Sequence, residues 1–152
     1  RAGALRGDDA AGMTLRDPSL PAAAVIAALD LRPHPEGGHY REAWRDAPAD
    51  GARGAGTAIH FLLAPGERSH WHRVDAAECW LWQAGGPLRL RMPGRAVVLG
   101  PDLAAGQTLM AVVPKGEWQA AEPLEGWALV ACTVAPAFDF AGFELAPEGW
   151  EP

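Results

Sequence analysis

The sequence predicts an all-β domain, and three observations lead to that prediction. Its 152 residues suffice for one hydrophobic core, and no repeat or linker supports a second domain. Its 18 glycines and 14 prolines are spread along the chain, which leaves little room for long helices. Short apolar or alternating segments follow one another after residue 38, bounded by Gly, Pro or Asp. Many short strands of this kind are typical of a sandwich or barrel.

The expected elements begin with a leader and one helix. Residues 1–12 are rich in Gly and Ala without periodicity, so we expect a flexible leader or tag remnant, followed by a single domain over 13–152. Ser19 and Pro21 resemble a helix N-terminus, which predicts a short helix over 19–30. Nine strands are then expected, at 39–44, 56–63, 69–74, 78–83, 87–92, 95–99, 107–113, 117–121 and 127–134.

Composition limits the partners and the compartment. The formal net charge is −6 and no run of Lys and Arg could neutralise a row of phosphates, so nucleic acid is not an expected partner. The longest apolar stretch, 22–29, is too short to cross a bilayer, which also argues against a membrane. Cys79 and Cys132 each lie in an apolar strand-like run, so we expect two buried thiols in a cytoplasmic protein.

The stretch from His70 to Glu78 is the most informative for chemistry. Residues two apart in a strand share a face, so His70 and His72 are expected to point the same way, with Glu78 returning on a neighbouring strand. Two imidazoles and a carboxylate suit a divalent metal ion such as Fe, Mn, Zn or Ni. The alternative is that both histidines only form hydrogen bonds within a polar barrel mouth. Both interpretations remain open at this point.

The same residues carry a resemblance to the cupin superfamily, which implies a double-stranded β-helix, or jelly-roll, barrel. Its first motif is a Gly, His-x-His, Glu and Gly, and its second is Pro-x-Gly followed by a His. The matching positions here are Gly66, His70, His72, Glu78 and Gly85, then Pro114, Gly116 and Gln119. The chain departs from the pattern in its spacing and in having Gln119 for the last His. An amide oxygen is a weak ligand for metals that prefer imidazole.

A narrower resemblance extends from Leu31 to Leu145. The boxes at 34–38, 69–74, 113–121 and 132–140 resemble a family of single-domain cupins of unknown function that carry the sequence His-Pro-Glu-Gly-Gly. That family is similar in fold to the sugar-nucleotide epimerase branch of the cupins. The resemblance implies a homodimer with a small-molecule pocket inside each barrel, and a Gln at the position of Gln119.

Two further groups allow more than one interpretation. The His-Pro-Glu-Gly-Gly box is either only a tight turn before the first strand or a contribution of Glu36, Tyr40 and Arg41 to the pocket rim. Trp80 and Trp82 share the face of Glu78 by strand parity. They form either a stacking wall for a ligand or part of the core.

Three functions fit these residues. The first is a metal-independent isomerase or epimerase for a sugar-like or other small polar ligand, with His72 as general base, Glu78 as its partner or a second acid, and Gln119 bound to the ligand. The second is a metal-dependent enzyme that uses His70, His72 and Glu78 as ligands. The third is a binding or storage protein without catalysis.

Overall fold

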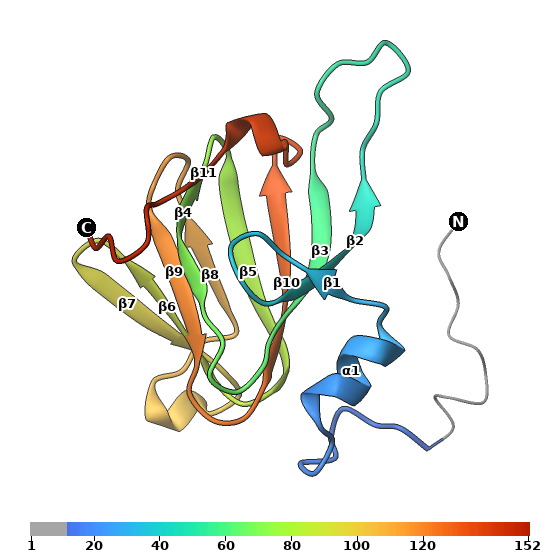
Figure 1. Cartoon of the computed structure of the whole chain (residues 1–152), viewed down its shortest axis with the longest axis vertical. Coiled ribbons are helices and arrows are strands. Elements are labelled where there is room, and N and C mark those ends of the chain that lie inside the picture. Colours follow the sequence, from blue (N-terminus) through green and yellow to red (C-terminus); the bar gives the residue numbers. More distant parts are fainter. Residues whose placement is uncertain (1–11) are drawn as a thin grey trace.

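Eleven strands form two antiparallel sheets in the computed structural model, which describes residues 12–152 (Figure 1). The first sheet has the order β1 (Arg32–Pro33), β2 (His39–Arg45), β3 (Thr57–Leu63), β10 (Ala128–Ala135), β5 (Ala77–Gly85) and β8 (Met110–Val113). The second has the order β11 (Phe143–Leu145), β4 (Ser69–Val74), β9 (Gln119–Pro123), β6 (Leu88–Met92) and β7 (Arg95–Leu99). Two short 3-10 helices, η1 (Leu103–Ala105) and η2 (Phe140–Gly142), interrupt the connections.

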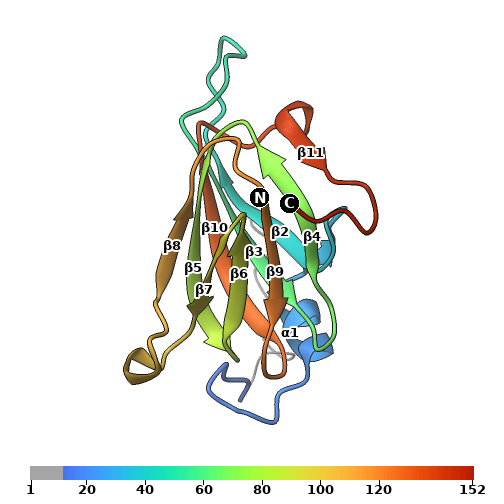
Figure 2. The same cartoon turned by 90° about the vertical axis from the view of Figure 1, so that its left-hand side faces the viewer.

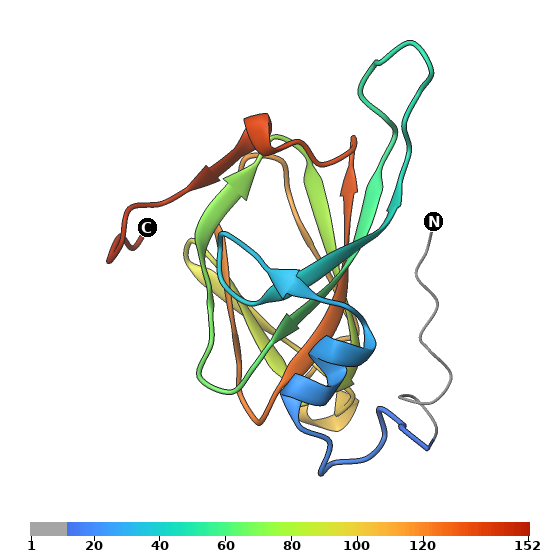
Figure 3. The same cartoon turned by 45° about the vertical axis from the view of Figure 1, so that its right-hand side comes forward.

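The two sheets curve around a shared interior, which Figures 2 and 3 show from two sides. Strand alternation fills that interior. In β6, for example, Leu88 and Leu90 are fully buried while Arg89 between them is exposed. They pack with Phe61, Trp80 and other apolar side chains of both sheets into one core. The prediction of an all-β fold is therefore confirmed.

The helix is shorter than expected. Helix α1 covers Ala22–Ala28, and its N-cap is Pro21 with no side-chain cap. Ser19 does not cap the helix, because its hydroxyl donates to Asp17 instead. Val25 packs against a second apolar cluster on the outer side of β3 and β10. Within residues 12–152, no helix has the length and apolar character needed to cross a bilayer.

The nine predicted strands all exist, with ends that differ by up to three residues from those predicted. Strands β1 and β11 were not predicted, because two or three residues are too few to show a period. The predicted leader, 1–12, lies outside the described residues apart from Gly12.

Two irregularities in strand pairing decide which side chains face the interior. The register of β4 against β9 shifts between Ser69 and His72. The register of β2 against β3 shifts between Glu42 and Trp44. An extra residue in one strand reverses the in-and-out alternation beyond it, so residues three apart share a face there.

Candidate functional site

A cavity of about 340 Å³ lies between the two sheets beside η2 and β11. This volume falls within the range of small-molecule sites in proteins. Its lining side chains come from β1 to β5, β10 and the C-terminal segment: Arg32, His34, Glu36, Tyr40, Arg41, Glu42, Arg45, Thr57, Ile59, His72, Val74, Glu78, Cys132, Val134, Phe138, Phe140 and Phe143. The predicted pocket inside the barrel is thus present as a cavity.

The two histidines of the His-x-His pair are on opposite sides of the sheet. His72 is buried and lines the cavity, whereas His70 is exposed and lies outside it. The register shift in β4 explains this separation, because it places Ser69 and His72 inside and leaves His70 outside. The expectation that both imidazoles share one face is wrong.

His72 presents a free ring nitrogen to the cavity. Its Nδ1 lies 2.8 Å from the carbonyl oxygen of His70, and a carbonyl oxygen only accepts, so Nδ1 carries the hydrogen. Nε2 is then an acceptor, and it has no hydrogen-bond partner among residues 12–152. Burial lowers the pKa of His72, while the charge of Glu78 and the His70 carbonyl raise it in part. His72 is therefore a neutral imidazole with a lone pair available to a ligand.

Glu36 reaches the interior because the box that contains it is a tight turn between β1 and β2. The N–H of Gly37 donates to the carbonyl of His34 at 3.0 Å. Gly37 has a φ of +107°, and a Cβ there would lie 2.1 Å from the carbonyl oxygen of Arg68. Only glycine fits, and the turn directs Glu36 inward. The His-Pro-Glu-Gly-Gly box forms a tight turn and also contributes side chains to the cavity. Glu36 is buried and does not lie at the rim.

Three polar side chains surround the carboxyl group of Glu36. Ser69 Oγ donates to it. The Nδ1 atoms of His34 and His72 each lie 3.2 Å from one of its oxygens. Burial raises the pKa of Glu36 to about 8, against the hydrogen bond from Ser69. Burial and the neighbouring His72 lower the pKa of His34 to about 4. Near neutral pH, Glu36 is mostly a neutral acid and His34 a neutral base.

Glu78 is held by Gln119, as part of a buried chain of hydrogen bonds. Gln119 Nε2 donates to Glu78 Oε2 at 2.7 Å, and Trp80 Nε1 donates to Gln119 Oε1 at 2.8 Å. Burial raises the pKa of Glu78 to about 7, with a further rise from Glu36, while His72, Gln119 and Cys132 lower it. Burial thus outweighs the stabilising effect of the imidazole on the carboxylate.

Of the two interpretations of Trp80 and Trp82, the structure supports the core and not the stacking wall. Trp80 is 1% exposed and packs edge-on against Phe61, with ring centroids 5.8 Å apart. Trp82 is partly buried, and its indole donates to the carbonyl of Gly86. Neither lines the cavity. Strand parity correctly predicts that both tryptophans share the face of Glu78. They lie further along β5, where apolar side chains fill the interior of the barrel.

The side chains do not fit the predicted metal site. His70 is outside the cavity, and both polar ends of the Gln119 amide are already engaged. Among residues 12–152, no three His, Cys, Asp or Glu side chains are arranged to share a metal ion. The set His70, His72 and Glu78 is therefore not a ligand set in this structure.

Several cavity residues were missed by sequence reasoning. Phe138, Phe140 and Phe143 form mutual edge-to-face contacts at one wall, and Phe143 also lies 5.5 Å from the ring of His72. Tyr40 was not missed: the rim interpretation of the His-Pro-Glu-Gly-Gly box includes it, and it lines the cavity and packs edge-on against His34, with ring centroids 4.5 Å apart. The Phe138–Phe140 box forms part of the family resemblance, but no strand is expected there. Strand parity therefore could not predict that these residues lie beside the cavity.

Comparisons with known proteins agree with the fold. A family model described as Cupin superfamily (DUF985) matches residues 23–146. Protein SO0799 from Shewanella oneidensis is 40% identical, with a TM-score of 0.79 over 84% of this chain and 85% of that one. A hypothetical protein from Leishmania major is 33% identical, with a TM-score of 0.75 over 84% of this chain and 88% of that one. No curated protein matches the chain.

More distant structures share only the fold. KdgF from Halomonas sp. is 16% identical, with a TM-score of 0.57 over 74% of this chain and 92% of that one. At this identity the likeness extends to the barrel and not to the side chains of the cavity.

Proposed function

This chain belongs to the cupin superfamily, in the family described as DUF985, and we propose that its cavity is the active site of a metal-independent isomerase or epimerase. The ligand is a small molecule, as the cavity volume of about 340 Å³ indicates, and the His, Glu and Arg side chains in the lining favour a polar one. One observation supports this function most strongly. The unpartnered Nε2 of His72 lines a cavity that also contains two buried carboxyl groups, those of Glu36 and Glu78.

Acid–base isomerisation needs groups that exchange protons near neutral pH. Burial brings the pKa of Glu78 to about 7 and that of Glu36 to about 8, so both change charge in that range. Neutral His72 is ready to accept a proton without first losing one. One imidazole and two carboxyl groups in one cavity can therefore remove a proton and return it.

The proposed step breaks a C–H bond next to a carbonyl group of the ligand. The proton moves to His72 Nε2, and the electron pair enters the carbonyl to give an enolate. Glu78 in its protonated form returns a proton to the same carbon from a different direction, which gives the epimer, or to the former carbonyl carbon while the neighbouring hydroxyl proton moves to the enolate oxygen, which shifts the carbonyl. Exchange with solvent then transfers the proton from His72 back to Glu78 and restores both groups. Ionisation of Glu78, whose charge raises the pKa of His72, stabilises the imidazolium that forms.

Proton exchange with solvent tests this step without knowledge of the natural substrate. A panel of aldoses, ketoses and hexuronates is incubated with the protein in D₂O, and deuterium incorporation at carbon is followed by NMR. We expect exchange with wild type and a loss of about 10²-fold or more in His72→Gln. His70→Gln is the matched control, because His70 is two residues away on the same strand but outside the cavity.

Two outcomes would contradict the proton-transfer step. Equal exchange in wild type and His72→Gln would remove His72 from the chemistry. Binding of a probe without any exchange would favour a binding protein without catalysis.

Metal analysis of untagged protein, with activity measured before and after chelator treatment, tests metal independence. Loss of exchange on removal of a stoichiometric metal would favour a metal-dependent enzyme.

A further inference from the structure

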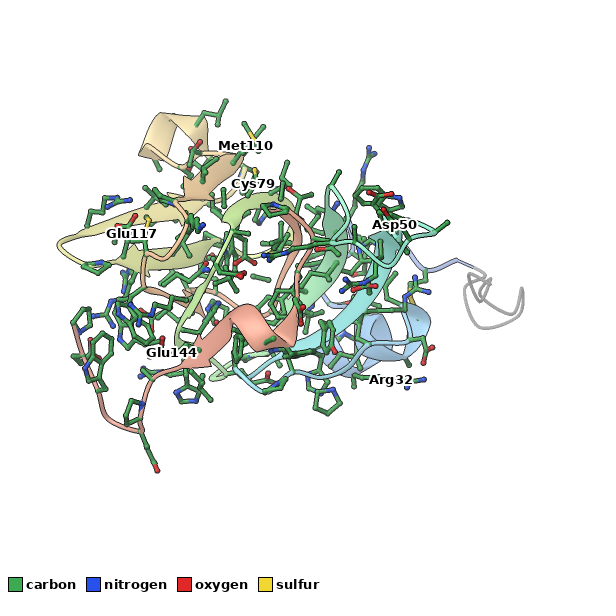
Figure 4. All side chains as sticks on the ribbon, turned by 90° about the horizontal axis from the view of Figure 1, so that it is seen from above. Arg32, Asp50, Cys79, Met110, Glu117 and Glu144 are labelled. Carbon is green, nitrogen blue, oxygen red and sulfur yellow. The ribbon has the colours of Figure 1, made fainter. Side chains whose placement is uncertain are left out.

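The rim of the cavity has a charge opposite to that of the chain as a whole. The formal net charge of the chain is −6, yet Arg32, Arg41 and Arg45 line the cavity beside one acidic rim residue, Glu42. Arg32 lies at the β1 edge of the barrel when the molecule is viewed from above (Figure 4). A local excess of arginine in an acidic protein suggests a specific anionic ligand.

Strand pairing turns two of these arginines toward the cavity. Arg32 is opposite Tyr40 and Arg45 is opposite Thr57, and both partners line the cavity. Residues directly opposite one another in antiparallel strands share a face. The register shift after Glu42 is what brings Arg45 to this face, since it turns Trp44 outward to a half-exposed position.

The guanidinium groups at the rim have donors to spare. Glu42 accepts from Nε and Nη2 of Arg45 at 2.8 and 2.9 Å, which fixes the side chain and leaves Nη1 unused. Arg32 makes no side-chain hydrogen bond or ion pair with any residue of the described range 12–152. Arg41 borders the cavity but lies opposite His60, which does not line it, and its Nε is buried, so this atom offers no donor to a ligand. Arginine forks of this kind match carboxylate and phosphate oxygens.

The floor of the cavity does not cancel this positive charge. Glu36 is mostly protonated near neutral pH, because burial raises its pKa to about 8. His34 and His72 are neutral there, since burial lowers the pKa of both. Glu78 is the exception, because its pKa of about 7 leaves it partly ionised near neutral pH. The three arginines that line the cavity still exceed the combined negative charge of Glu42 and Glu78.

We infer that the ligand is a small organic anion, whose carboxylate or phosphate group binds Arg32 and Arg45 at the rim while its polar body reaches His72 and Glu78. This inference rests on the proposed function in placing the ligand in this cavity, but it concerns binding and not turnover. Phe138 and Phe140 give the cavity an apolar wall against which a ring-shaped body packs.

Calorimetry with matched probes tests the inference. Glucuronate carries a carboxylate and glucose 6-phosphate carries a phosphate, which are the two candidate anionic groups. Glucose carries neither, and inorganic phosphate is an anion without a sugar ring. We expect at least one charged sugar to bind about tenfold or more tightly than glucose at low salt, with affinity that falls as salt is added. The stronger of the two charged sugars distinguishes carboxylate from phosphate.

Variants of the rim locate the effect. Arg32→Gln should weaken binding of the charged sugar about tenfold and leave glucose binding unchanged, because Arg32 is exposed and unpaired. Arg89→Gln is the matched control, since Arg89 pairs with Glu122 on the outer face of β6. Equal affinity for glucose and the charged sugars, no binding by either charged sugar, or no effect of Arg32→Gln would overturn the inference.

The two proposals fail separately. Tight binding of a charged sugar without deuterium exchange would remove the isomerase and keep the anion site. Exchange that prefers neutral sugars would keep the isomerase and remove the anion site.

Discussion

The side-chain amide of Gln119 donates to Oε2 of Glu78 at 2.7 Å, and both side chains are buried inside the barrel. We expect Gln119→Leu to lower the free energy of unfolding by about 1–3 kcal/mol, because the Trp80 indole and Glu78 both lose a buried partner. Urea unfolding measures the change. Gln83→Leu, at an exposed position of β5, is the control and should have little effect. Equal stability of the two variants would show that the Gln119 contacts are replaced by others.

The sequence contained enough information for the sheets and for the inward position of Gln119. Period-2 alternation in segments such as Leu88–Met92 reports directly which side chains are buried. The match of Gln119 to the second cupin motif placed it inside, and the structure confirms its burial. The expected contact of Gln119 with a ligand is not supported, because Gln119 does not line the cavity and both ends of its amide are engaged. Its partners, Glu78 and Trp80, come from another strand, so the hydrogen bonds themselves were not predictable.

The position of His70 could not be predicted, for a physical reason. Strand parity assumes an unbroken ladder, and one register shift between Ser69 and His72 reverses it. A bulge depends on the pairing partner β9, which follows much later in the chain, and not on a local residue pattern. The same limit applies to Arg45, which the shift in β2 turns toward the cavity.

Stability should fall as the pH rises above 6.5. Burial raises the pKa of Glu36 to about 8 and that of Glu78 to about 7 from 4.5, so the folded state holds protons that the unfolded state has released. Unfolding then releases protons and becomes easier at higher pH. Below 6.5 the depressed pKa of His34 acts in the opposite direction, because the unfolded chain there binds the extra proton. The carboxyl effect is therefore isolated above 6.5.

Glu36→Gln should flatten this pH dependence. The wild type is expected to lose on the order of 2 kcal/mol between pH 6.5 and 8, and the variant clearly less. Urea unfolding at several pH values in this range provides the comparison. Glu125→Gln, at an exposed position, should retain the wild-type slope. A slope in Glu36→Gln as steep as in wild type would show that Glu36 is already ionised in the folded protein.

The C-terminal segment should support β4 from outside. Trp150 packs against Trp118 and Trp71, with ring centroids 4.6 and 6.3 Å apart, and Trp71 precedes His72 on the strand. We expect Trp150→Ala to cost about 1–3 kcal/mol of unfolding free energy because these contacts are lost. Leu103→Ala, at an exposed position of η1, should change stability by less than about 0.5 kcal/mol. Thermal unfolding of both variants distinguishes a supporting segment from a loosely attached one.

A homodimer through the outer face of the six-stranded sheet remains our proposal. Strand pairing places one row of outward side chains across it: Trp44, Ala58, Thr133, Cys79 and Val112. Val112 and Met110, which lie two residues apart on the same face of β8, are both more than half exposed. Figure 4 shows Met110 and Cys79 on one outer side of the molecule. An exposed apolar sheet face of this kind is typical of an interface.

Light scattering at micromolar concentration checks the proposed dimer. We expect the mass of two chains for wild type and of one chain for Val112→Glu, because a buried, unpaired charge would oppose association. Leu103→Glu introduces the same charge away from this face and should remain dimeric. A wild-type monomer under these conditions would contradict the proposal.

The charge coupling between Glu78 and His72 provides the most direct test of the acid–base chemistry. The Glu78 carboxylate raises the pKa of His72 against the larger, opposite effect of burial, so the two groups titrate as a pair. Glu78→Gln removes that charge, and the pKa of His72 should fall further below its usual range. NMR titration of the ring nitrogens of His72 measures it. Deuterium exchange should fall about 10²-fold in the same variant, since the proton donor is lost. An unchanged His72 titration would mean that the two side chains do not communicate, and the cavity would then be better explained as a binding site without acid–base catalysis.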